Sequence, residues 1–207
     1  INKGYNLEDL ENTDPKLIKE MRNLYFDQIE SYKKNKNKKI TIDKMPLNLV
    51  HVGEILRFFP NAKFILALRH PYDCVLSCFM QNFMLNHAMA NFLNLDDTLK
   101  LYDLTMSLWK RYTNVFTIDH HLIRYEDVVS NFKKTIGDLL KFLNVKWSDN
   151  VIEFYKTAEK RGIINTPSYN QVSQPIYSNS MYRWKNYEKE FRKSNISLEN
   201  WVKEFNY

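Results

Sequence analysis

The 207-residue chain is long enough for one domain with its own core, and its 44% hydrophobic and 14% aromatic content excludes an intrinsically disordered protein. Thirty basic and 24 acidic residues give a formal charge of +6, which favours anionic partners without informing the fold. No apolar run approaches the roughly 20 residues of a membrane span. A disulfide framework or a zinc site would need more ligands than the two cysteines, and we expect a cytoplasmic protein without a bound metal.

The first third of the chain predicts helix, strand and helix. Asp14 and Pro15 are a helix-start signal, and apolar residues then recur at three- and four-residue steps up to Lys33. The run KKNKNKK (33–39) is typical of a surface turn. The next segment, Ile40–Ile42, consists of β-branched residues and predicts a short strand. Residues 49–59 predict a second helix.

The remainder continues the alternation of strands and helices. Residues 62–68 (AKFILAL) predict a strand that is buried on both faces of a parallel sheet. Cys74 and Cys78 are four residues apart in the helix that follows, and we interpret them as two small apolar core residues. The other predicted elements are helices over 71–83, 95–114, 148–160 and 184–207, a strand at 122–125, a helix capped by Asp127, and a polar loop over 161–183.

This alternation predicts an α/β fold with a mainly parallel sheet flanked by helices. Lys44 and Arg69 each follow a predicted strand, and ligands of open α/β sheets bind beyond the carboxyl ends of the strands. Ser77 lies eight residues after Arg69, about two helical turns further on. Two cations and a hydroxyl at one sheet edge predict a phosphate or sulfate site.

The run DKMPLN…FPNAKFILALRHPYDCVLSCFMQNF resembles the core of the sulfotransferases that use 3′-phosphoadenosine 5′-phosphosulfate (PAPS), especially their bacterial and tyrosylprotein-type branch. In that family, an arginine after the second strand and a serine eight residues later bind the 3′-phosphate, and Arg69 and Ser77 match both. A lysine 25 residues before that arginine lies beside the bridging oxygen of the phosphosulfate. Lys44 has this offset.

Three further residues extend the resemblance to residues 40–188. Tyr125 in LIRYEDV is similar to a tyrosine that contacts the nucleotide, and Ser168 and Arg183 resemble the serine and basic residue that close the nucleotide site. The resemblance implies a P-loop-NTPase-like sulfotransferase fold, with residues 1–207 forming a single domain that corresponds to its C-terminal portion. It also implies PAPS as co-substrate, no metal, and a hydroxyl acceptor on a small molecule, carbohydrate or peptide.

The chain departs from the family pattern in two places. No stretch matches the glycine-containing loop Gly-x-x-Arg-Ser-Gly-Thr that wraps the 5′-phosphosulfate in the family. Pro46 also occupies the position at which the cytosolic branch has the histidine that acts as general base. His51 and Glu54 are the next titratable residues after Pro46 in the sequence, and we assign the role of general base to neither of them. We expect either an N-terminally incomplete enzyme or a reduced homologue, and in both cases weak PAPS binding and poor transfer by this chain.

Several alternatives stay open at this point. Arg69 in isolation is equally compatible with a structural salt bridge to Asp73 or Glu54. A nucleotide kinase or phosphotransferase on a related fold would need a phosphate loop ending in Gly-Lys-Ser/Thr, which the chain does not contain. A basic nucleic-acid-binding module would use the positive charge and the aromatic residues, although these residues fall mostly on core-facing helical positions. The sequence does not indicate the acceptor or the oligomeric state.

Overall fold

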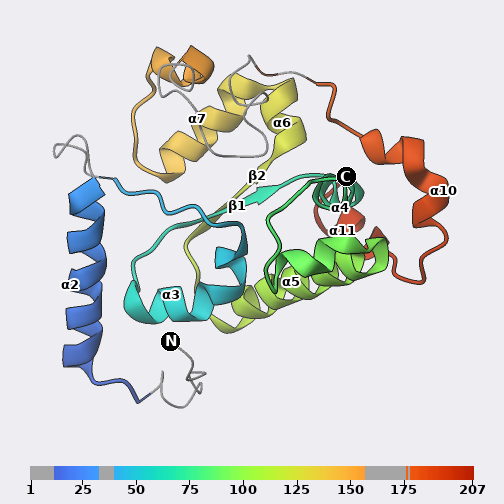
Figure 1. The fold of residues 1–207 in the computed structure, drawn as a ribbon. Helices are drawn as coiled ribbons and strands as arrows, with labels where there is room; N and C mark the ends of the chain where they lie inside the picture. Colours follow the sequence, from blue (N-terminus) through green and yellow to red (C-terminus); the bar gives the residue numbers. More distant parts are fainter. Residues whose placement is uncertain (1–11, 33–39, 157–175, 177) are drawn as a thin grey trace. The chain divides into compact units, whose positions relative to one another are not determined.

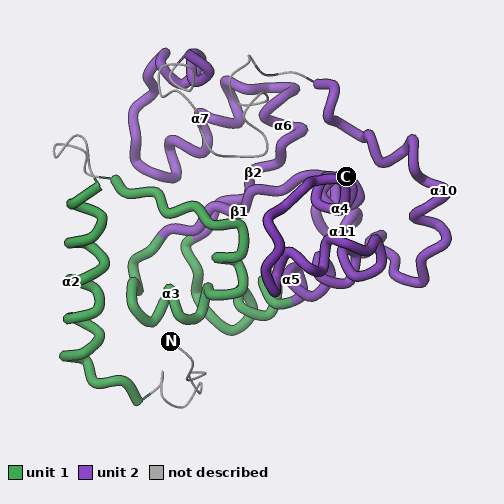
Figure 2. Tube along the Cα trace, in the orientation of Figure 1, with its two compact units in different colours: residues 1–62, 108–119 green, residues 63–107, 120–207 purple. Residues whose placement is uncertain are grey.

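The structure, a computed structural model, describes residues 12–32, 40–156, 176 and 178–207. The chain consists of two compact units (Figure 2): unit 1 comprises residues 1–62 and 108–119, and unit 2 comprises residues 63–107 and 120–207. The single domain expected over residues 1–207 stays a prediction.

Unit 1 contains two helices of the N-terminal part of the chain, blue and cyan in Figure 1. The helix α2 (Pro15–Tyr32) begins as predicted, with the Asp14 carboxylate accepting the Lys16 N–H at 2.8 Å. A 3-10 helix, η1 (Pro46–His51), leads into α3 (Val52–Phe58). The ring of Phe59 lies 5.0 Å from that of Tyr25 and 5.7 Å from that of Phe26. These contacts attach α2 to the end of α3.

Unit 2 contains a parallel sheet of two strands, β1 (Phe64–Leu68) and β2 (His120–Arg124). The parallel arrangement confirms the predicted α/β class. Burial of β1 on both faces was a wrong prediction, because Leu66 and Leu68 are buried while Ile65 is 37% exposed. The predicted strand Ile40–Ile42 is also wrong, since residues 40–45 have no regular secondary structure. A third strand is therefore absent from the described residues.

The helices up to residue 142 follow the predicted order with shifted ends. The predicted helix 184–207 is instead divided into three short helices, and the predicted helix 148–160 begins with a 3-10 turn over Asp149–Val151. The predicted helix 71–83 ends at Phe79, and Asp127 does not cap the next helix because that helix already starts at Tyr125. A break at Asn131 then separates two helices where one was expected. The described elements of this part of the chain are α4 (Pro71–Phe79), η2 (Met89–Leu93), α5 (Leu95–Val115), α6 (Tyr125–Ser130), α7 (Phe132–Phe142), η3 (Asp149–Val151), η4 (Arg183–Tyr187), α10 (Glu188–Phe191) and α11 (Glu199–Glu204).

The core of unit 2 is formed by side chains of α4, α5 and the C-terminal segment. Leu99 and Leu198 are fully buried, and the Leu198 N–H donates to the Tyr72 hydroxyl at 3.1 Å. The Trp201 indole N–H donates to Asp103 at 2.7 Å. The C-terminal segment is thus part of the core.

An aromatic cluster surrounds His70, which is only 4% exposed. Its ring stacks on Trp184 with centroids 5.1 Å apart, and Tyr72 and Tyr207 also contact it. Burial lowers the pKa of His70. The negative charges of Asp73, Glu126 and Glu199 act in the opposite direction but are outweighed, and the positive charge of Lys185 lowers the pKa of His70 further. The imidazole is therefore held in its neutral form more strongly than in the unfolded chain.

Substitution of two leucines of α5, one buried and one exposed, tests which face of this helix is buried. Replacing the fully buried Leu99 by Ala is expected to lower the free energy of unfolding by about 2–5 kcal/mol, because the substitution leaves a cavity. Leu104, on the same helix, is 56% exposed, and its replacement by Ala should change the free energy by less than about 0.5 kcal/mol. Urea unfolding measures both values, and equal losses would contradict the assignment.

Replacing His70 by Gln is expected to reduce the loss of stability between about pH 7 and about pH 5.5. Because the pKa of His70 is lower in the folded chain than its ordinary 6.5, the unfolded chain binds a proton first. Stability therefore falls as the pH drops below 6.5 and stops falling at the folded pKa. Urea unfolding at both pH values measures this, with the exposed His87→Gln as control. A fall as large in His70→Gln as in the unchanged chain would contradict it.

Candidate functional site

The predicted ligand residues Arg69 and Tyr125 are brought together by the register of the two strands. Leu68 pairs with Arg124, and these are the last residues of β1 and β2. The next residue of each chain segment, Arg69 and Tyr125, therefore emerges at the same edge of the sheet. The guanidinium carbon of Arg69 lies 5.4 Å from the centre of the Tyr125 ring, a cation–π contact.

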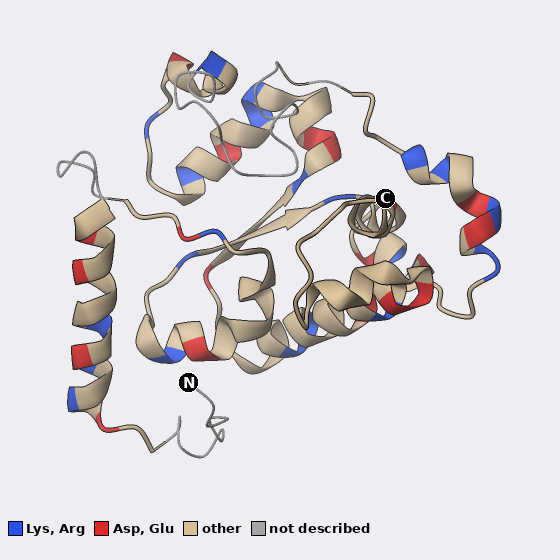
Figure 3. Cartoon of the chain, in the orientation of Figure 1, with Lys and Arg blue, Asp and Glu red and all other residues tan. Residues whose placement is uncertain are grey.

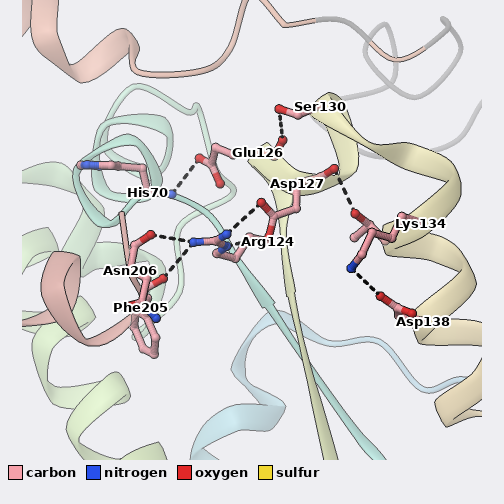
Figure 4. A network of polar contacts seen from close by, with 10 residues as sticks. His70, Arg124, Glu126, Asp127, Ser130, Lys134, Asp138, Phe205 and Asn206 are labelled. Atoms are coloured by element: carbon pink, nitrogen blue, oxygen red, sulfur yellow. Dashed lines mark hydrogen bonds and ion pairs between the residues drawn. The ribbon is translucent and has the colours of Figure 1, made fainter.

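A buried hydrogen bond joins the two turns that carry these residues (Figure 4). The Glu126 carboxylate accepts the backbone N–H of His70 at 3.0 Å, and both side chains are at most 5% exposed. A buried carboxylate needs such donors, since burial without them is strongly unfavourable. Glu126 thus ties the start of α4 to the start of α6. Sequence reasoning missed this residue, because neither its spacing nor its context indicated burial.

Arg124, the last residue of β2, is held by a second set of hydrogen bonds (Figure 4). Its guanidinium grips Asp127 with two bonds of 2.7 and 2.9 Å, and it also donates to the carbonyls of Phe205 and Asn206 at 3.2 and 2.6 Å. The bond to Asp127 raises the pKa of Arg124. The residue before Tyr125 is therefore held by both local and long-range contacts.

The Arg69 guanidinium is partly engaged within the protein. One of its terminal nitrogens donates to the carbonyl of Ser180. Asp73 does not form the ion pair that the sequence left open, because its carboxylate accepts backbone N–H groups of Tyr182 and Trp184 instead. Glu54, the other open partner, pairs with His51.

The Nε of Arg69 is buried and has no hydrogen-bond partner among the described residues. A buried donor without an acceptor is unfavourable, and an anionic oxygen of a ligand would satisfy it. The residues at this sheet edge thus fit an anionic group such as a phosphate.

The other predicted nucleotide ligands of unit 2 are exposed. Ser77 lies on α4, and Arg183 is the first residue of η4; within the described parts of the chain neither side chain forms a hydrogen bond or ion pair. Both are available to a ligand. Ser168 lies outside the described residues.

The two cysteines of α4 lie within the electrostatic reach of Arg69. Both are free thiols, and a hydrogen bond between them raises the pKa of Cys74 and lowers that of Cys78. The positive charge of Arg69 opposes the rise in the pKa of Cys74 and adds to the fall in the pKa of Cys78. Both cysteines are partly buried, in keeping with the predicted packing role.

Lys44 belongs to unit 1, where its side chain is exposed and forms no hydrogen bond or ion pair with the described residues. Its neighbour Asp43 accepts a hydrogen bond from the Tyr25 hydroxyl at 3.0 Å, and burial together with Asp43 raises the pKa of Tyr25. This bond attaches the irregular segment 40–45 to α2. It places the backbone of Lys44 without engaging its ammonium group.

Charge is mixed along the described α-helices, because each one that carries Lys or Arg also carries Asp or Glu (Figure 3). Within the same residues, no helix has the length and apolarity to cross a membrane. No group of three His, Cys, Asp or Glu in the described ranges is arranged to hold a metal.

Two curated proteins are similar to this chain. An uncharacterized protein of Aquifex aeolicus is 31% identical over 85% of the chain and 23% of its own length. Protein-tyrosine sulfotransferase 1 of Danio rerio is 28% identical over 69% of the chain and 41% of its own length. The chain therefore spans less than half of either relative.

The sequence profile of the Sulfotransferase family matches residues 5–149, a range that includes Lys44, Arg69, Ser77 and Tyr125. The match covers well over half of the 207 residues. This agrees with the resemblance stated from the sequence, and it favours that interpretation over a kinase or a nucleic-acid-binding module. The chain belongs to the sulfotransferase family.

Proposed function

We propose that this chain binds PAPS and takes part in the transfer of its sulfuryl group to a hydroxyl acceptor. The observation that carries the proposal is the half-buried Arg69, which stacks on Tyr125 at the shared end of two parallel strands and keeps a buried donor without an acceptor. Family membership supports the reaction class. In this proposal, the sheet is part of the P-loop-like sulfotransferase fold.

Arg69 and Ser77 are the proposed ligands of the 3′-phosphate, with Arg183 and Ser168 closing the site. A guanidinium offers two parallel N–H groups to a phosphate, which a lysine ammonium does not. Ser77 adds a hydroxyl that is exposed and has no partner among the described residues. Tyr125 would contribute a ring face to the nucleotide in addition to its contact with Arg69.

Lys44 is the proposed catalytic residue, on the strength of its match to the family lysine. Sulfuryl transfer resembles phosphoryl transfer in depending on positioning and charge stabilisation. Negative charge develops on the bridging oxygen as the bond to sulfur breaks. An ammonium group there stabilises the transition state more than the ground state, which raises the rate.

The proposed acceptor is a hydroxyl of a small molecule, a carbohydrate or a peptide. The name of the zebrafish relative, a protein-tyrosine sulfotransferase, supports a tyrosine hydroxyl as one candidate. PAPS supplies the activated sulfuryl group when bound, and the chain supplies charge, orientation and hydrogen bonds.

The proposed 3′-phosphate site predicts a preference between two nucleotides. Adenosine 3′,5′-bisphosphate should raise the melting temperature of the 207-residue chain more than 5′-AMP, because only the former carries the phosphate that Arg69 would bind. Changing Arg69 to Ala should reduce the affinity for the bisphosphate by roughly tenfold to hundredfold and leave that for 5′-AMP unchanged. Thermal melting and isothermal titration measure both effects.

Arg111→Ala is the matched control, since this arginine is exposed on α5 and its loss removes the same charge. Arg69→Lys should restore only part of the affinity, because a lysine keeps the charge but not the paired N–H groups. Equal melting shifts by the two nucleotides in the unchanged chain would refute the proposed site.

A further inference from the structure

Asp73 is the only side chain with an ionisable group that is 0% exposed within the described residues. One carboxylate oxygen accepts the N–H of Tyr182 at 2.5 Å, and the other accepts the N–H of Trp184 at 2.8 Å. Arg183 lies between these two donors. A single carboxylate therefore holds the backbone on both sides of a proposed phosphate ligand, across more than 100 positions of sequence.

The backbone around Arg183 is shaped to receive this anion. Tyr182 has φ 55° and ψ 27°, in the left-handed region, and Arg183 begins the 3-10 helix η4. A left-handed residue followed by a helical one turns successive N–H groups toward one point and forms a concavity for an anion. Here the concavity holds the Asp73 carboxylate. The unusual conformation of Tyr182 is explained by the two bonds that it makes possible.

Two neighbours of Asp73 hold the same loop. Arg69 donates to the carbonyl of Ser180, and the His70 ring stacks on Trp184 at an interplanar angle of 17°. Residues 69–73, which include the start of α4, thus contact the segment 180–184 (the C-terminal loop) through three side chains. Since Arg69 is one of them, the loop and Arg69 are fixed relative to each other.

We propose that Asp73 is a positioning residue of the nucleotide site, which orients Arg183 toward the 3′-phosphate by fixing the N–H groups on either side of it. This inference rests on the proposed function, in which Arg69 and Arg183 bind that phosphate. Asp73 itself does not touch the ligand. The exposed guanidinium of Arg183 has no hydrogen-bond or ion-pair partner in the described residues, so within them only the backbone sets the point and direction from which this side chain extends.

Asp73→Asn tests the inference, because the amide replaces one acceptor oxygen by a donor that faces a backbone N–H. The preference for adenosine 3′,5′-bisphosphate over 5′-AMP should fall by roughly tenfold, with the affinity for 5′-AMP unchanged. Asp138→Asn on α7 is the matched control, since this exposed carboxylate pairs only with Lys134 in the described structure. It should leave the preference intact.

A double-mutant cycle separates positioning from general support of the fold. If Asp73 acts through Arg183, the double variant Asp73→Asn, Arg183→Ala should lose no more of the preference than Arg183→Ala alone. Losses that add up, or an equal loss of 5′-AMP affinity, would overturn the inference and leave the proposed function standing. No preference in the unchanged chain would instead refute the proposed function.

A measurement on the unchanged chain covers the case in which Asp73→Asn does not fold. In a titration with adenosine 3′,5′-bisphosphate, the side-chain Nε–H nuclear magnetic resonance signals of Arg69 and Arg183 should both shift, and 5′-AMP should shift neither to the same extent. A shift of Arg69 without one of Arg183 would overturn the positioning role of Asp73 and retain the Arg69 site.

Discussion

The buried bond from the His70 N–H to Glu126 is the interaction on which the candidate site depends. Parallel pairing of β1 and β2 ends both strands at one edge, but the strands alone do not fix the turns that follow. Glu126 joins these turns inside the protein, where a lost acceptor would leave a buried N–H unsatisfied. Arg69 and Tyr125, the residues immediately before His70 and Glu126, are thereby kept in contact. The C-terminal loop then attaches to the same turn through Asp73 and Ser180.

The sequence predicted the residues of the sheet edge better than the contacts that hold them. Arg69 and Tyr125 were identified because strand ends and family spacing are local features, and both were found at the same edge. The bonds of Glu126 and Asp73 join residues 56 and about 110 positions apart, and no periodicity reports on such pairs. The family resemblance covered Arg183, but it did not indicate that a buried carboxylate holds its neighbours.

The errors in the predicted fold have a common physical origin. Ile40–Ile42 has the β-branched residues of a strand, yet a strand exists only with a hydrogen-bonded neighbour, and residues 40–45 have none in the described structure. Exposure of Ile65 shows that, within the described residues, part of one face of this two-stranded sheet is left uncovered. Helices were predicted more accurately, because their hydrogen bonds are internal and their periodicity is a property of one segment.

The left-handed backbone at Tyr182 has a consequence for attempts to engineer this protein. Glycine adopts such dihedral angles without steric conflict, so Tyr182→Gly would relieve backbone strain there. That exchange would remove the ring that contacts His70 and Lys185, and the segment would gain freedom in the unfolded chain and in the native one. The relief of backbone strain is therefore opposed by the lost ring contacts and by the greater freedom of the unfolded chain, so glycine at this position does not favour a more heat-resistant protein.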